Sequence, residues 1–102
     1  MASLIVLSDI HIAKKWDELE KVFPEKTNYL NPNKYLREVI ASLKIEDTLV
    51  FNGDLVDYYY CEYSSQNKSN WSIFFSIIKD FKGKCFFIMI IEKVLIILVF
   101  TD

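Results

Sequence analysis

One stretch decides the fold of this chain: Leu49-Val50-Phe51-Asn52-Gly53-Asp54-Leu55-Val56-Asp57. Its first residues are continuously apolar, which is typical of a strand in a parallel sheet that is covered on both faces. Gly53 ends this run and is one of only two glycines in the chain, so it indicates a backbone that bends tightly or approaches a ligand closely. Acids that directly follow such a strand lie at the edge where open α/β sheets place their binding crevice. The stretch therefore predicts a functional site at the end of a central strand.

The same pattern of apolar strand and acid occurs near the N-terminus. Residues 4–7 are apolar and are followed directly by Ser8-Asp9-Ile10-His11. Between the two strands a helix is predicted from Pro32 to about Lys44. Asn31 suits its N-cap, proline suits its first position, and apolar residues recur at i, i+3, i+4 and i+7.

A second helix is predicted between the central strand and a third apolar run at residues 85–91. It should follow a polar surface loop at residues 64–70, be capped by Ser69 or Asn70, present an aromatic stripe within residues 71–81, and stop at Gly83. The order strand, helix, strand, helix, strand predicts an α/β fold with a mostly parallel sheet and right-handed crossovers.

Two segments are less clearly patterned. Residues 14–23 have apolar positions at roughly helical spacing over barely two turns, which predicts a weak helix or an ordered loop. Residues 94–100 are all apolar and predict a further strand, or a terminus that would differ in a longer protein. A bilayer helix is disfavoured there, because Glu92 and Lys93 interrupt the apolar run.

Composition narrows the class of protein. A chain of 102 residues that is 52% hydrophobic is expected to form one domain with a sizeable core. The net charge of -2 and the absence of a basic cluster argue against a nucleic-acid surface. Cys61 and Cys85 lack metal or redox spacing, and the N-terminus lacks an export pattern, so a reducing cytoplasm with unpaired thiols is expected.

Three side chains are candidate metal ligands. On an extended chain Asp9 and His11 point to the same side, with Ile10 turned away. Asp54 lies at the end of the neighbouring predicted strand and could bridge to a second ion. Imidazole together with carboxylates favours manganese, iron or zinc over calcium.

Five more residues have candidate supporting roles. Asp57 is expected to orient His11 or to hold the loop by accepting backbone N–H bonds, as carboxylates around metal ligands often do. Asn52 and Gly53 are expected to support the same loop. Tyr58 and Tyr59 are candidates for lining a substrate cleft, with partial burial at the surface as the alternative.

The residues from Leu7 to His11 and from Phe51 to Asp57 resemble the first two signature blocks of the calcineurin-like metallophosphoesterases, D-x-H and G-D-x-x-D. The resemblance implies an α/β/β/α sandwich, of which this chain is the β-α-β-α-β half. It also implies hydrolysis of a phosphate mono- or diester by a hydroxide activated between two metal ions. Asp9 and His11 would hold the first ion, and Asp54 would bridge both.

The resemblance covers about residues 3–89, and residues 90–102 form an atypical tail. The family's G-N-H-[ED] and G-H-x-H blocks are absent, and His11 is the sole histidine, so no catalytic residue is assigned and the second metal site is incomplete. We therefore expect a truncated or degenerate phosphoesterase, such as a frameshifted product, with little independent activity. The alternative is a non-catalytic metal-binding or interaction remnant. A half-domain would expose one sheet face, which predicts oligomerisation or poor solubility.

Overall fold

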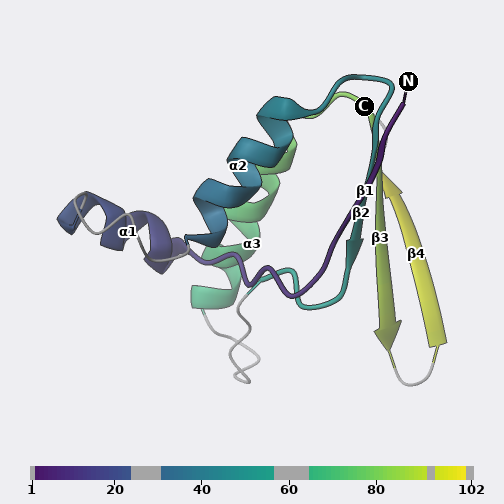
Figure 1. Cartoon of the computed structure of the whole chain (residues 1–102). Helices are drawn as coiled ribbons and strands as arrows, with labels where there is room; N and C mark the ends of the chain where they lie inside the picture. Colours follow the sequence, from purple (N-terminus) through teal and green to yellow (C-terminus); the bar gives the residue numbers. More distant parts are fainter. Residues whose placement is uncertain (1, 24–30, 57–64, 92–93, 101–102) are drawn as a thin grey trace.

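The computed structural model describes residues 2–23, 31–56, 65–91 and 94–100. These residues form one sheet and three helices (Figure 1). Along the chain the elements are β1 (Leu4–Leu7), α1 (Lys14–Val22), α2 (Pro32–Ser42), β2 (Thr48–Asn52), α3 (Ser65–Ile78), β3 (Lys84–Ile91) and β4 (Val94–Phe100).

The sheet has the strand order β1-β2-β3-β4. β1 pairs with β2 and β2 with β3 in parallel, whereas β4 runs antiparallel to β3. The predicted α/β class with a mostly parallel sheet is therefore confirmed. The apolar residues 94–100 form a strand because folding back beside β3 satisfies the backbone hydrogen bonds along one of its two edges.

All three helices lie on one side of the sheet (Figure 1). The expectation that the sheet is covered on both faces is therefore wrong for the part of the chain that the structure describes. The helices lie on one face because of the way in which the strands are connected. The two crossover helices α2 and α3 join strands that are added in one direction, so crossovers of one hand place both helices on the same face. The last connection leads directly to β4 and contributes no helix.

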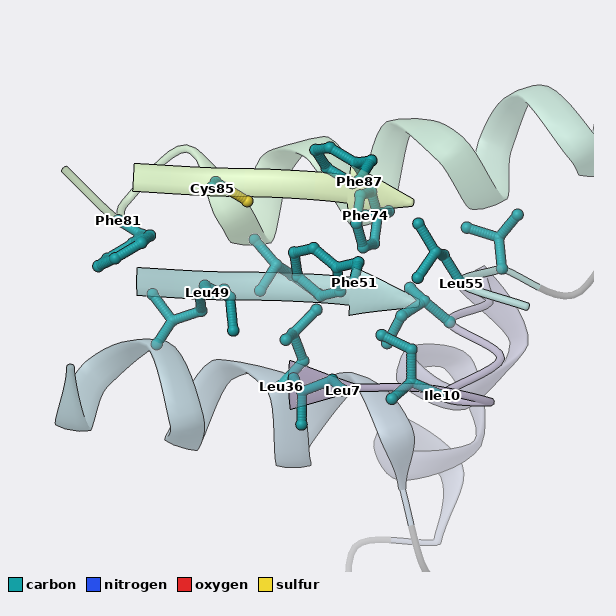
Figure 2. Close-up of a cluster of buried hydrophobic side chains, with 14 residues drawn as sticks. Leu7, Ile10, Leu36, Leu49, Phe51, Leu55, Phe74, Phe81, Cys85 and Phe87 are labelled. Atoms are coloured by element: carbon teal, nitrogen blue, oxygen red, sulfur yellow. The ribbon is translucent and has the colours of Figure 1, made fainter. Parts of the chain in front are cut away.

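The core lies between the sheet and the helices (Figure 2). Phe51 of β2 is fully buried at its centre. Its ring lies 5.0 Å from that of Phe74 of α3, edge to face, and 5.1 Å from that of Phe87 of β3, stacked. Such pairs add to the free energy gained from burying the rings themselves. Leu36 of α2 is also fully buried and completes this centre.

The predicted start of α2 is confirmed in detail. The Asn31 side chain accepts hydrogen bonds from the backbone N–H groups of Asn33 at 3.0 Å and Lys34 at 3.2 Å, and Pro32 occupies the first turn. The helix ends at Ser42, two residues before the predicted end. The segment predicted as a weak helix or an ordered loop is a helix, α1.

The predicted boundaries of α3 are wrong at both ends. The helix already begins at Ser65, so most of the expected polar loop is helical. Asn67 and Asn70 are buried there, and the Asn70 side chain accepts a hydrogen bond from the backbone N–H of Lys14 at 2.9 Å. These polar side chains therefore serve internal contacts rather than a solvated loop.

The other end of α3 lies at Ile78, well before Gly83. Gly83 has a different role, because a Cβ atom there would lie 2.7 Å from the carbonyl oxygen of Asp47 and 2.8 Å from that of Ile45. Gly83 thus allows the chain entering β3 to pass close to the turn that precedes β2.

Candidate metal centre

The loops that follow β1 and β2 are joined by backbone hydrogen bonds. The N–H of Asp9 donates to the carbonyl of Gly53 at 3.3 Å, and the N–H of His11 donates to that of Asp54 at 3.1 Å. Ile12 extends the pairing through its N–H to the Leu55 carbonyl at 2.9 Å. These hydrogen bonds lie beyond the regular strand ladder, with one isolated parallel bridge between Ile12 and Val56, and they hold the two predicted motifs side by side.

Apolar and polar side chains alternate in these loops. Ile10 and Leu55 point into the core (Figure 2), and both are buried. Asp9, His11 and Asp54 are exposed. The prediction that Ile10 turns away from its two neighbours is therefore confirmed, and the buried pair anchors both loops beneath the exposed polar residues.

The backbone of the three polar residues is left-handed. The φ angles are 53° at Asp9, 50° at His11 and 46° at Asp54, and these are the non-glycine residues with positive φ in the described ranges. The extended chain assumed for Asp9 and His11 is therefore wrong, because the cross-loop hydrogen bonds impose a different conformation. This conformation costs roughly 1–2 kcal/mol per non-glycine residue, and aspartate tolerates it better than most.

These three residues form a group that could hold one metal ion. One ligand atom from each of Asp9, His11 and Asp54 lies within 4.8 Å of the others. Nitrogen and oxygen donors bind zinc at about 2.0–2.2 Å, so two donors of one ion lie at most about 4.4 Å apart. Exposed side chains can close that difference by small rotations. The residues present therefore fit one divalent ion, and the sequence prediction of these three as a group agrees with the structure.

The predicted supporting residues have different outcomes. Gly53 has a φ of 72°, and a Cβ atom there would meet nothing within 4 Å. Of the two roles predicted for it, the tight bend is therefore confirmed in the structure. Asn52 is exposed at the carboxyl end of β2, and its supporting role stays a prediction. Asp57, Tyr58 and Tyr59 lie outside the described residues.

Sequence reasoning missed the residues that hold the chain just after His11. Asn33 of α2 is fully buried, and its side chain accepts from the Ala13 N–H at 3.2 Å and donates to the Ala13 carbonyl at 2.7 Å. The Trp16 indole N–H donates to the His11 carbonyl at 3.3 Å. These hydrogen bonds could not be predicted because their partners are distant in sequence. The only local signal near residue 33 was the helix cap at Asn31.

An ion pair fixes α1 against α2. The guanidinium of Arg37 donates to both carboxylate oxygens of Asp17, at 2.8 and 2.9 Å. This hydrogen bonding lowers the pKa of Asp17 and raises that of Arg37. The pair is partly exposed, so it orients α1 rather than contributing much stability.

The cysteine within the described residues is not a metal ligand in this structure. Cys85 lies in the core (Figure 2), and burial raises the pKa of its thiol to about 11. A buried thiol of that pKa is protonated and unreactive at neutral pH. Cys85 therefore serves as a core residue.

Comparisons with family models, with curated proteins and with solved structures yield no match to this chain. Among the described residues, no helix is long and apolar enough to cross a membrane. The assignment of a role to Asp9, His11 and Asp54 therefore depends on their geometry and on the two sequence motifs.

Proposed function

We propose that the chain binds a divalent transition-metal ion through Asp9, His11 and Asp54. One observation carries this proposal: the residues whose donors converge within 4.8 Å are also the non-glycine residues with left-handed backbone in the described ranges. Exposed acids can gather by chance, but here the cross-loop hydrogen bonds also hold each of the three donors in a backbone conformation that costs free energy, and such outliers cluster at functional sites. A bound ion would in addition offset the repulsion between the two carboxylates.

The donor set favours a class of ion, and the resemblance of the two motifs to the calcineurin-like metallophosphoesterases implies a class of substrate. Two carboxylates and one imidazole suit manganese, iron or zinc. When bound, such an ion neutralises charge on a phosphoryl group and lowers the pKa of a nearby water. We therefore propose that the site belongs to a metal-dependent phosphoesterase acting on a phosphate mono- or diester, within half of an α/β/β/α sandwich.

Independent turnover by this chain should be small. The described donors provide for one ion, and Asp54 has a second oxygen that could face another. His11 is the only histidine in the sequence, so if it holds an ion it is not available to protonate a leaving group. Losing several members of a cooperating site removes most of its rate enhancement.

Calorimetric titration of the metal-free chain with Mn²⁺ and Zn²⁺ tests the binding proposal. We expect one ion per chain, and at least about tenfold weaker binding for Asp54→Asn and His11→Ala, since even residues around a metal site's ligands contribute that much. Asp80→Asn is the matched control, because Asp80 is exposed in the turn that follows α3. Equal affinity in all of these proteins would contradict the assignment.

A second assay separates catalysis from binding alone. The chain is incubated with Mn²⁺ and a bis(nitrophenyl) phosphate, and release of nitrophenol is compared with that of Asp54→Asn. We expect at most a small release above that of Asp54→Asn, whereas equal release by the two proteins together with tight metal binding would favour the alternative function, a non-catalytic metal-binding module. Turnover that disappears in Asp54→Asn would instead establish an independent phosphoesterase.

A further inference from the structure

The sheet face opposite the helices is apolar and exposed. The strand register places one row of residues, Val6, Val50, Phe86 and Val99, side by side across all four strands. Val6 is 56% exposed and Val99 is 54% exposed. Neighbouring rows on the same face extend this surface, here called the open face, with the apolar residues Leu4, Ile88, Leu95 and Ile97.

The polar positions of the open face lie at its ends. Thr48 and Lys84 share the row of Leu4 at one end, and Asn52 shares the row of Ile88 at the other. The row between them, Val6, Val50, Phe86 and Val99, contains no charge. A sheet face in contact with water normally carries polar residues, which alternate along each strand with the apolar residues of the buried face. An apolar centre with a polar rim is instead the composition of a protein interface.

We propose that the open face is a dimer interface, on which a second copy of this chain packs its own open face. The two sheets would lie about 10 Å apart, as in a β-sandwich. Two copies of one apolar face are complementary without any pairing of charges, and each copy presents the same surface, which a symmetric dimer requires.

The size of the open face decides the strength of this dimer. Strands about 4.8 Å apart with a rise of about 3.3 Å per residue make a four-stranded face of about six residues close to 400 Å² in projection. Two such faces bury at least about 800 Å², and somewhat more once their side chains interlock, which is below the range of stable specific interfaces and within that of weak, transient ones. The dimer should therefore be weak and reversible.

Sedimentation velocity over protein concentrations from about 1 to 500 μM tests the proposal. The buffer contains EDTA, so the outcome is independent of the proposed metal site. We expect a monomer–dimer equilibrium without larger species. Val99→Glu should raise the dissociation constant at least tenfold, because it places a charge in the central row. The matched control is Val22→Glu, since Val22 is 66% exposed on α1 and should leave the equilibrium unchanged.

A second variant, Val6→Glu, places the same charge in that row on β1, and circular dichroism of both variants confirms that they fold. A chain that stays monomeric at every concentration would overturn the proposal, whether or not it then binds another protein or lipid vesicles. So would a dimer that neither variant weakens. Species larger than the dimer would indicate open-ended pairing through the edge of β4, and would overturn it as well.

Discussion

Replacing Asn33 by aspartate probes how the helical layer holds the metal loop. Asn33 is fully buried and both accepts from and donates to the backbone of Ala13. Aspartate has the same shape, but an ionised carboxylate cannot donate to the Ala13 carbonyl, whose oxygen lies 2.7 Å from the Asn33 amide nitrogen. A protonated carboxyl group can donate to it. The pKa of the introduced carboxyl should therefore be raised in the folded state.

Protonation sets an upper limit to the loss of stability. Protonating a carboxyl of unfolded-state pKa about 3.9 costs about 1.4 kcal/mol per pH unit above that value. The free energy of unfolding should therefore fall by up to about 4 kcal/mol at pH 7, and by only about 1.5 kcal/mol at pH 5. The sign follows from the raised pKa, because the folded state of the variant binds the proton more tightly, so its deficit shrinks as the pH falls.

Urea denaturation of wild type and Asn33→Asp at several pH values measures this difference. The matched control is Ser72→Asp, because Ser72 is exposed on α3 and a surface change should alter stability by less than about 0.5 kcal/mol. Asn33→Ala should lose stability at all pH values, since it can form neither bond. The reasoning would be refuted if Asn33→Asp were as stable as wild type at pH 7, or if the difference in their free energies of unfolding did not change with pH.

Three further predictions concern turns and pH. Gly53→Ala should lower the free energy of unfolding by about 1–2 kcal/mol in urea denaturation, because φ is 72° and the surrounding space is open; Gly53→Asn should lose less, and equal losses would count against a backbone cause. Gly83→Ala should lower the thermal midpoint by more than Gly53→Ala, because its Cβ would lie 2.7 Å from a backbone carbonyl; an unchanged midpoint would disprove the close approach. Hydrogen bonds from the Lys44 and Ser3 N–H groups lower the pKa of Asp47 from its ordinary value of 3.8. The contribution of ionised Asp47 to the free energy of unfolding is therefore complete above the ordinary pKa and is lost as the pH falls through the lowered pKa. Urea midpoints of wild type and Asp47→Asn should therefore converge at acid pH, and parallel curves would rule this out.

Several features of the candidate site follow from local sequence. Asp9, His11 and Asp54 stand directly after apolar strand runs, and in the structure their donors converge. The bend at Gly53 could be predicted because a glycine between a strand and an acid usually marks an unusual backbone. Neighbouring residues determine such features, so a single sequence contains the information.

The sequence by itself determined the order of the parallel strands and crossover helices, the cap at Asn31 and the identity of the metal-ligand candidates. Only the tertiary structure decided the left-handed backbone of the donors, because it arises from hydrogen bonds between two loops about 40 residues apart. The tertiary structure also decided the hydrogen bonds of Asn33 and Asn70, because their backbone partners lie 20 and 56 residues away. Which face of the sheet remains open was likewise decided by where all three helices pack, since an apolar strand residue has the same local propensity on either face.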